Sequence, residues 1–340
     1  MRVLLISGSY PPEFCGIGDY TSKLSSNLML AGTDVHVLAN INWSVKNIIK
    51  IIKQIKAVKP NLIHIQYPSA GYGYSITPQI ISLLFKTVVT IHEVSQGFWV
   101  RKLSLMPFSF RSTLIFTNLF ELQSFKKLFP WTRKDCHIIP IGSNISVEKI
   151  VPIEKKDTSS IIYFGQIRPQ KGMEDVLKLA QIVKAENLPY KIIIVGQLFE
   201  RFKDYYNSVL NSIQDLEIEW RLNLSEMEVG EILSSNMISY LPYPDGASAR
   251  RGSLFAALQN KMLVFTTNGS QTTPDIKRSV VITSSPEEVC GLLKDNLNLP
   301  DMLQSKEKDI DSLIKSISWP EIVRQHNVLY RNEANNVLEV

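Results

Sequence analysis

Residues 240–258, YLPYPDGASARRGSLFAAL, have the composition of an anion-binding loop. The stretch passes from an apolar strand end, through a turn of small residues, into a helix that begins near Gly252. Small residues let backbone N–H groups approach a ligand, and the first helical turn adds free amides and a positive dipole end. One carboxylate, Asp245, and two guanidinium groups, Arg250 and Arg251, flank the turn. The stretch therefore suits an anionic, hydroxyl-rich ligand such as a nucleotide sugar, although small polar residues also form ordinary turns.

A second basic turn, RPQKG, follows the apolar run at 160–166 and offers Arg168 and Lys171. A cation about 4 Å from a surface phosphate gains roughly 4 kcal/mol at an effective dielectric constant near 20. The two turns together therefore predict a diphosphate site. The only Asp-x-Asp occurs in the helical pattern DIDS at 309–312, so we expect no metal and no cofactor. The basic side chains and the helix N-terminus would neutralise a leaving phosphate themselves.

Strands must alternate with helices in both halves of the chain to position these turns. Short apolar runs predict buried parallel strands at 3–7, 35–39, 62–68, 87–93, 113–118, 136–145, 160–166, 191–196, 216–222, 238–241, 263–267 and 279–283. Helical patterns lie between them, and further helices are predicted at 286–296, about 302–316 and 319–335. This order predicts an α/β fold with two doubly wound parallel sheets that carry helices on both faces.

The length of 340 residues suggests two domains. Residues 146–158 are charged, contain Pro152 and lack periodicity, so we interpret them as the linker. The predicted domains are 1–150 and 151–317. A cleft between two such domains is a common place for a ligand.

Composition excludes several classes of protein. Apolar residues make up 44% of the chain, yet no apolar run reaches the roughly 18–20 residues that a membrane span needs. The short apolar run at the start is typical of a first strand rather than a signal peptide. Three distant cysteines without CxxC spacing indicate neither a disulfide framework nor a zinc site, so we expect a cytoplasmic protein.

Charge is distributed unevenly along the chain. The first 150 residues carry 16 basic and 7 acidic side chains, net +9, whereas the remainder carries 21 and 25, net −4. A basic first domain suggests an anionic partner, which could be a membrane, a phosphorylated substrate or a nucleic acid. Nucleic acid is the least favoured of these, because no recognisable binding module accompanies the charge.

Two basic segments of the first domain could contact an anionic membrane. In residues 44–59, Ile48, Ile49, Ile52 and Ile55 form one stripe, and lysines recur on another face. This segment is either a solvated helix that covers the sheet or an interfacial helix. Residues 97–112 mix aromatic and basic side chains, which fits lipid headgroups or an internal helix equally well.

Three further residues of the first domain are candidates for function. Gly16 and Gly18 precede a helix for which Asp19 is a plausible N-cap. A dinucleotide fingerprint is disfavoured there, because the third glycine is missing and the loop is too long. His92 ends the strand at 87–93, where ligands gather in open α/β sheets, although a buried core imidazole remains an alternative.

The whole chain resembles the GT-B glycosyltransferases of family 4, which transfer sugars from nucleotide donors with retention at the anomeric carbon. Each motif that carries the resemblance is weak alone, but six occur in the family's order. They are PPEFCGIGDYT after the first strand, TIHE at 90–93, IPIGSN at 139–144, YFGQIRPQKG at 163–172, LPYPDGAS and RRGSLFAAL at 241–258, and SISWPEI at 316–322. The last resembles the start of a closing helix, 318–340, that crosses back onto the first domain.

The resemblance implies a role for each matching residue. Gly16 and Gly18 would lie near the donor phosphates and acceptor, and His92 by the donor sugar at the reacting face. Asp245 would bind the transferred sugar's hydroxyls, and like His92 it is expected to be catalytic. The remaining donor-binding residues would be Arg168 and Lys171 on the diphosphate, Leu222, Asn223 and Leu224 along the base, the amides of Gly246, Ala247 and Ser248 on the sugar, and Ser253 with Leu254 at the helix start.

Two positions depart from the family pattern. The usual pair of glutamates, eight residues apart, is Asp245 and Ser253 here, which leaves the ribose contact and the donor open. The arginine usual after the glycine of the basic turn is Gln166, and Arg168 could replace it.

We therefore expect a retaining hexosyltransferase that uses a nucleoside-diphosphate sugar. Its acceptor would be a hydroxyl of a glycan or lipid-linked molecule in cell-surface polysaccharide biosynthesis, at the inner face of the cell membrane. The alternative is a nucleotide-sugar-binding GT-B protein without transferase activity, either an epimerase-type enzyme or a membrane-associated pathway partner.

Overall fold

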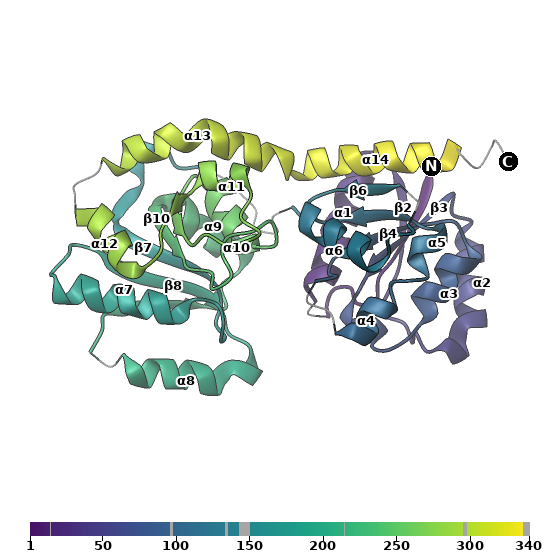
Figure 1. Cartoon of the computed structure of the whole chain (residues 1–340), viewed down its shortest axis with the longest axis horizontal. Coiled ribbons are helices and arrows are strands. Elements are labelled where there is room, and N and C mark those ends of the chain that lie inside the picture. The colour runs from purple at the N-terminus through teal and green to yellow at the C-terminus, as the bar shows by residue number, and fades with distance from the viewer. Residues whose placement is uncertain are drawn as a thin grey trace. The chain divides into compact units, whose positions relative to one another are not determined.

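The structure, a computed structural model, describes residues 1–13, 15–95, 98–132, 135–142, 150–213, 215–294 and 298–335. The chain divides into two compact units. Unit 1 comprises Met1–Gly142 with Ile317–Val340, and unit 2 comprises Ser143–Ser316. Each unit has its own parallel sheet and its own core (Figure 1).

Unit 1 contains six strands, flanking helices and the last helix of the chain. In order these are β1 (Arg2–Ile6), α1 (Gly16–Leu30), β2 (Asp34–Leu38), η1 (Val45–Asn47), α2 (Ile48–Val58), β3 (Leu62–Tyr67), η2 (Ala70–Tyr72), α3 (Thr77–Leu84), β4 (Thr87–Ile91), α4 (Trp99–Leu103), α5 (Phe108–Arg111), β5 (Thr113–Phe116), α6 (Leu119–Leu128), β6 (Cys136–Ile138) and α14 (Trp319–Asn335).

The sheet of unit 1 has the strand order β2-β1-β3-β4-β5-β6, and all of its strand pairs are parallel. The central strands β3 and β4 are buried along their whole length, as expected for strands covered on both faces. Because every strand points the same way, the loops that follow them share one edge. The loop before α1 and the residue His92 after β4 both lie at that edge.

Helix α14 completes the core of unit 1. It packs against α1 and β3, and it buries Ile322 and Tyr330 in the same cluster as Val3 and Leu5 of β1. Tyr330 also forms a 2.6 Å hydrogen bond with the ring of His64 on β3. Helix α14 therefore belongs to unit 1, because its side chains complete the apolar core of that unit.

Unit 2 repeats the alternation of strands and helices. Its elements are η3 (Ile153–Lys155), β7 (Asp157–Gln166), α7 (Met173–Ala185), β8 (Lys191–Gln197), η4 (Glu200–Phe202), α8 (Lys203–Ser212), β9 (Ile218–Leu222), α9 (Glu226–Ser235), β10 (Asn236–Leu241), α10 (Gly252–Gln259), β11 (Leu263–Thr266), α11 (Pro274–Ser279), β12 (Val281–Ile282), α12 (Pro286–Lys294) and α13 (Leu299–Ser316).

The sheet of unit 2 has the order β12-β11-β10-β7-β8-β9 and is parallel throughout. The neighbours β11, β10 and β7 form its centre, and β10 is fully buried. The loops after these three strands must therefore lie side by side at the carboxyl edge. This edge carries both turns that the sequence singled out.

The structure confirms the predicted α/β fold with two doubly wound parallel sheets. Some local predictions were wrong. Helix α1 begins at Gly16 with Cys15 as its N-cap, so Asp19 lies within the first turn instead of capping it. Residues 274–279 form helix α11, which we did not predict, although Thr273 as its N-cap and Pro274 at the first helical position were available signals.

The segment that we interpreted as the linker is more ordered at its end than expected. Residues 146–149 lie outside the described residues. Lys156, however, is buried and donates hydrogen bonds to the carbonyls of Ser234 and Asn260, the latter at 2.9 Å. Among the described residues no helix is both long and apolar enough to span a bilayer.

Candidate functional site

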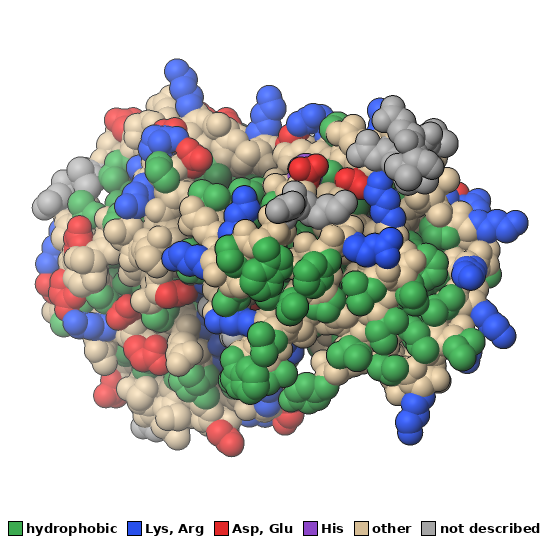
Figure 2. Space-filling model, turned by 45° about the vertical axis from the view of Figure 1, so that its right-hand side comes forward, with side chains coloured by type: hydrophobic (Ala, Val, Ile, Leu, Met, Phe, Trp, Pro, Cys, Tyr) green, Lys and Arg blue, Asp and Glu red, His purple; other side chains and the backbone are tan. Residues whose placement is uncertain are grey.

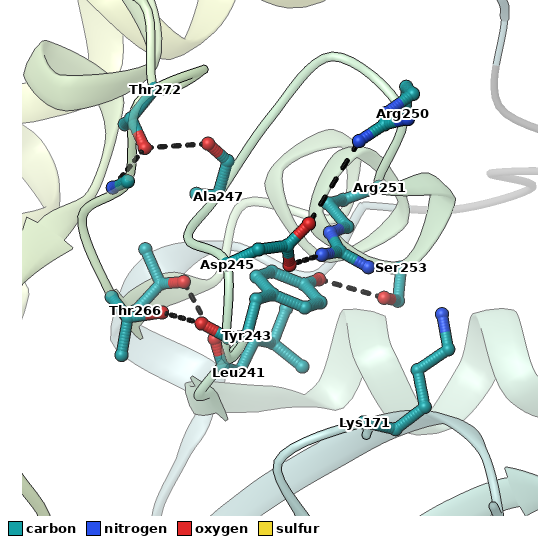
Figure 3. Close-up of polar contacts among 12 residues, drawn as sticks. Lys171, Leu241, Tyr243, Asp245, Ala247, Arg250, Arg251, Ser253, Thr266 and Thr272 are labelled. Atoms are coloured by element: carbon teal, nitrogen blue, oxygen red, sulfur yellow. Dashed lines mark hydrogen bonds and ion pairs between the residues drawn. The ribbon is translucent and has the colours of Figure 1, made fainter. Parts of the chain in front are cut away.

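Three neighbouring loops form the candidate site at the carboxyl edge of the unit 2 sheet. They are 167–172 after β7, 242–251 after β10 and 267–273 after β11. The strands that precede them are adjacent in the sheet, so the loops are adjacent as well. Figure 3 shows the polar contacts that hold this region together.

The loop after β7 is fixed by a glycine that approaches another backbone. Gly172 has φ +78°, and a Cβ there would overlap the carbonyl of Pro242. Only glycine adopts this conformation without strain and leaves room for that contact. The hydroxyl of Tyr163, on β7, donates a 3.1 Å hydrogen bond to the carbonyl of Lys171. The basic turn is thereby held against the loop that carries Asp245.

The loop after β10 is braced by the loop after β11. Gly246 has φ +86° and packs its backbone against Gly269, so that a Cβ on either residue would overlap the other loop. The hydroxyl of Thr272 donates a 2.7 Å hydrogen bond to the carbonyl of Ala247. It also accepts a 2.9 Å bond from the amide of Gly269 (Figure 3). The loop around Asp245 is therefore a built structure rather than a loose turn.

Asp245 lies between two arginines. Arg251 contacts one of its carboxylate oxygens, and Arg250 lies 3.9 Å from the other. The guanidinium group of Arg251 also stacks over the ring of Tyr243, 4.6 Å from its centroid. The Tyr243 hydroxyl in turn lies 2.8 Å from the hydroxyl of Ser253 (Figure 3). Burial raises the pKa of Tyr243, so this hydroxyl is neutral.

Lys171 adds a further positive charge to this site. Its amino group points towards Ser253 and Arg251 in Figure 3. The pKa of Lys171 is lowered to about 8, first by burial and then by three nearby guanidinium groups. These belong to Arg168, Arg251 and Arg250. Four cations and one carboxylate thus converge, as predicted for Arg168, Lys171 and the Asp245 turn, and such a cluster is suited to an anion.

The backbone amides of the site are less available than expected. The amide of Gly246 donates to Tyr243 and that of Ala247 to Thr267, both at 2.9 Å. The amide of Leu254 donates to the Arg251 carbonyl at 3.0 Å. These three amides brace the loop and the first turn of α10, so the predicted sugar and phosphate contacts do not extend to them.

Three other amides near the start of α10 are those of Ser248, Gly252 and Ser253. None has an acceptor among the residues that the structure describes. Two polar side-chain atoms, the Ser248 hydroxyl and the Nε of Arg251, are also buried there without a hydrogen-bond partner. Buried polar atoms are almost always paired, so these groups indicate a polar ligand at the N-terminus of α10.

The residues expected at the base lie at the same edge but farther along it. Leu222 ends β9, and β7 and β8 separate that strand from β10. Asn223 is committed to the fold, because its amide donates to Gly196 at 2.8 Å and its side-chain oxygen accepts from Leu198 at 2.9 Å. Leu222 and Leu224 are partly buried against the core. Contact of Leu222, Asn223 and Leu224 with a nucleotide base therefore stays a prediction.

The predicted residues of unit 1 occupy its own carboxyl edge. Gly18 packs closely against the loop after β1, where a Cβ would lie 2.9 Å from the Ser9 carbonyl oxygen. Gly16 begins α1 and has open space around it. Phe14, within the same motif, lies outside the described residues, as do Ser143 and Asn144 of the motif at 139–144.

His92 has the environment of the buried core imidazole that the sequence left as an alternative. Its Nε2 lies 2.9 Å from the Oε1 of Gln66, and its ring packs edge-on against Tyr20. Burial, and then His326, lower the pKa of His92 to about 3. The ring is neutral at pH 7, so a role towards a sugar would be one of hydrogen bonding or position rather than acid catalysis.

Sequence reasoning gave no role to Tyr243 or to Thr272. Tyr243 lies in the quoted motif, where its aromatic face beside two arginines was the available signal. Thr272 lies in the polar stretch after β11. The rule that places the carboxyl ends of neighbouring parallel strands together could have found it.

No protein-family model and no curated protein matches this sequence. Solved structures do match it over nearly the whole chain. A glycosyltransferase from Rickettsia africae has a TM-score of 0.78 and 14% identity, covering 98% of this chain and 99% of that chain. HepE of Anabaena, solved with UDP and glucose, has a TM-score of 0.71 and 11% identity, covering 98% and 100%. An α-glucosyltransferase solved with UDP and a 13-mer DNA has a TM-score of 0.68 and 13% identity, covering 97% and 99%.

These similarities show the fold. The two six-stranded parallel sheets with flanking helices are those of the GT-B structures, which confirms the predicted fold class. At identities of 11–14% the similarity carries the fold alone, and the chemistry must be argued from the site.

Proposed function

We propose that this protein is a retaining glycosyltransferase that moves a hexosyl group from a nucleoside-diphosphate sugar to an acceptor hydroxyl. The observation that carries the proposal is the cluster of positive charge around Lys171, to which Arg168, Arg250 and Arg251 contribute and beside which helix α10 begins (Figure 3). The chain also shares its fold with HepE of Anabaena, which was solved with UDP and with UDP and glucose.

The diphosphate would bind between Lys171 and the first turn of α10. The amides of Gly252 and Ser253 would donate to it, and the ammonium of Lys171 would offset its charge. Asp245 and the Ser248 amide and hydroxyl would contact the hydroxyls of the transferred sugar. With Ser253 in place of the usual glutamate, the ribose would lack that carboxylate contact.

The reaction would break the bond between the anomeric carbon and the diphosphate oxygen. Its electron pair leaves with the nucleoside diphosphate, and negative charge develops on the oxygen beside Lys171 and the α10 amides. The acceptor oxygen forms the new bond from the same face, and its proton passes to the leaving phosphate. The protein's part is to stabilise that charge without a metal, and one such group contributes about 3 kcal/mol, or roughly a hundredfold in rate.

The acceptor would be a glycan or a lipid-linked molecule of cell-surface polysaccharide biosynthesis, which places the protein in the cytoplasm at the inner membrane face. Peripheral membrane contact is part of this proposal. Two segments were considered for this contact. The first contains α2, which buries Ile51 and Ile55 and exposes Ile49. The buried stripe of α2 therefore includes Ile51, which we did not predict, and excludes Ile49, which we did. The segment 97–112, of which Gly97 lies outside the described residues, instead exposes Phe98, Trp99 and Phe110 and buries Phe108.

The test is incubation of the purified chain with UDP-, GDP-, ADP- and TDP-hexoses, with and without a membrane-lipid extract as acceptor. We expect nucleoside diphosphate to be released from one donor, faster with acceptor, and to an equal extent in EDTA. Lys171→Ala should lower the rate about a hundredfold with unchanged circular dichroism.

Three results would contradict the proposal in different ways. Binding of a sugar nucleotide without release would favour the non-catalytic binding protein. Conversion of the donor sugar to its epimer would favour epimerase chemistry. Near-normal transfer by Lys171→Ala would remove the phosphate role of the cluster.

A further inference from the structure

A group of large apolar side chains projects from the segment that follows β4 in unit 1. Phe98 is 85% exposed, Trp99 72% and Leu103 57%, and Val100, Met106 and Phe110 are also exposed. Single exposed apolar residues are ordinary, but large contiguous patches mark interaction sites. This short segment concentrates six of them.

Neighbouring elements extend this surface. Leu83 and Leu84, at the end of α3, are exposed, and the Leu83 carbonyl accepts a 2.7 Å hydrogen bond from Arg111. On the other side, the half-exposed Trp131 donates through Nε1 to Ser109 at 3.3 Å. We name the exposed apolar side chains of α3, of residues 98–110 and of Trp131 the aromatic face. Figure 2 shows a broad field of hydrophobic side chains on unit 1, bordered by Lys and Arg.

The aromatic face is held in place from beneath. Leu105 and Phe108 are buried in the core, and the Tyr67 hydroxyl lies 2.7 Å from that of Ser104. At the start of the segment, the buried Glu121 carboxylate accepts hydrogen bonds from the amides of Val94 and Ser95 at 2.7 and 2.9 Å. The packing therefore orients the apolar side chains outward as a feature of the fold.

Charge indicates what covers this face. Residues 98–132 contain five basic side chains: Arg101, Lys102, Arg111, Lys126 and Lys127. Their only acidic residue is Glu121, which is fully buried beneath the segment. A surface that combines exposed Trp and Phe with an excess of positive charge complements a headgroup layer that is negatively charged above an apolar interior.

We propose that the aromatic face docks unit 1 onto the surface of an anionic lipid bilayer. Phe98, Trp99 and Leu103 would enter the boundary between headgroups and acyl chains, and Arg101 and Lys102 would contact lipid phosphates. The inference deepens the proposed function, since it places a lipid-linked acceptor beside the protein, but its test needs no transfer reaction.

The experiment is co-sedimentation of the full chain with vesicles of phosphatidylglycerol and phosphatidylcholine, compared with phosphatidylcholine alone. We expect binding to the anionic vesicles that weakens with salt. Phe98→Ser with Trp99→Ser should weaken binding tenfold or more, about the effect of withdrawing two aromatic side chains from the interface. Arg101→Gln and Lys102→Gln should each weaken it about fivefold.

Ile49→Ser is the matched control, because Ile49 is an exposed apolar residue beside lysines on α2. We expect it to bind vesicles like the wild type. A loss in Ile49→Ser with retention in the double serine variant would assign the contact to α2 and overturn the proposal.

Quenching by brominated lipids reports the depth of Trp99. We expect quenching of tryptophan fluorescence in a Trp131→Phe background that the additional change Trp99→Phe largely removes. Equal quenching in Trp99→Phe, or no binding to anionic vesicles, would overturn the proposal. A dimer in solution that the double serine variant dissolves would instead assign the face to a second copy. The double serine variant should bind nucleotide with the affinity of the wild type. This titration separates failure of the membrane proposal from failure of the proposed function.

Discussion

Lys171 is partly buried beside three arginines, and no described side chain provides it with a counter-ion. Such a residue costs stability in the free protein, because burial and like charges both disfavour its charged form. A bound diphosphate would offset this cost, because its negative charge stabilises the charged form of Lys171. At the scale of single residues, the site is thus arranged for a ligand rather than for its own stability.

Lys171→Met should therefore stabilise the free protein while weakening nucleotide binding. The folded-state pKa of Lys171 is about 8, below its ordinary 10.5, so the unfolded chain holds more protons between those values. The free energy of unfolding should rise through that pH window in the wild type and rise less in the variant. At pH 7 we expect a gain on the order of 1–2 kcal/mol in urea unfolding. A destabilised variant with the wild-type pH profile would contradict this.

The sequence predicted the charged members of the site better than its backbone. Arg168, Lys171 and Asp245 could be placed together because two short turns follow adjacent parallel strands. The amides of Gly246 and Ala247 could not be judged, because their acceptors, Tyr243 and Thr267, depend on how the loops pack. His92 was ambiguous for the same reason, since burial and the contact with Gln66 come from tertiary structure.

At the scale of elements, two loops approach so closely that a side chain cannot fit between them. Gly172→Ala should destabilise unit 2 by about 2–4 kcal/mol and weaken nucleotide binding, because the new Cβ would overlap the carbonyl of Pro242 and alanine is strained at the φ of +78° that Gly172 adopts. Differential scanning calorimetry and nucleotide titration would measure the two effects.

Gly291→Ala is the matched control, because Gly291 lies within α12 with open space around it. There the gain in helix propensity should stabilise the protein by about 0.5–1 kcal/mol. Equal effects of the two substitutions would contradict the role of the Gly172 contact.

Strand and helix order could be predicted because apolar runs and helical periodicity are local properties. The sequence could not show which isoleucines of α2 are buried. Ile49 is exposed and Ile51 is buried, and this difference depends on how the helix is rotated against the sheet. Burial of Lys156 was likewise hidden, since its acceptors lie 78 and 104 residues further along the chain.

At the scale of the whole molecule, the end of the chain returns to stabilise its beginning. Helix α14 brings His326 next to His64 of β3, with ring centroids 5.6 Å apart, and both side chains are fully buried. Burial lowers the pKa of His326 to about 4 and that of His64 well below its ordinary value. Unit 1 therefore depends on neutral histidines.

Unit 1 should lose stability as the pH falls below about 6.5 and continue to lose it towards 4. The unfolded histidines bind protons in that range and the folded ones do not, so the free energy of unfolding decreases as the pH decreases. His326→Phe should weaken this dependence, as followed by hydrogen exchange in α14.

The most direct test of the nucleotide site is calorimetric titration of UDP, GDP, ADP and TDP into the protein at pH 7 in EDTA. We expect one of them to bind, with affinity about 10- to 100-fold weaker in Lys171→Met, because one charged hydrogen bond to phosphate is lost. Lys277→Met, at an exposed lysine of α11, should bind like the wild type. Equal affinity in Lys171→Met and the wild type, or binding that requires a divalent metal, would contradict a diphosphate held by Lys171 and the α10 amides.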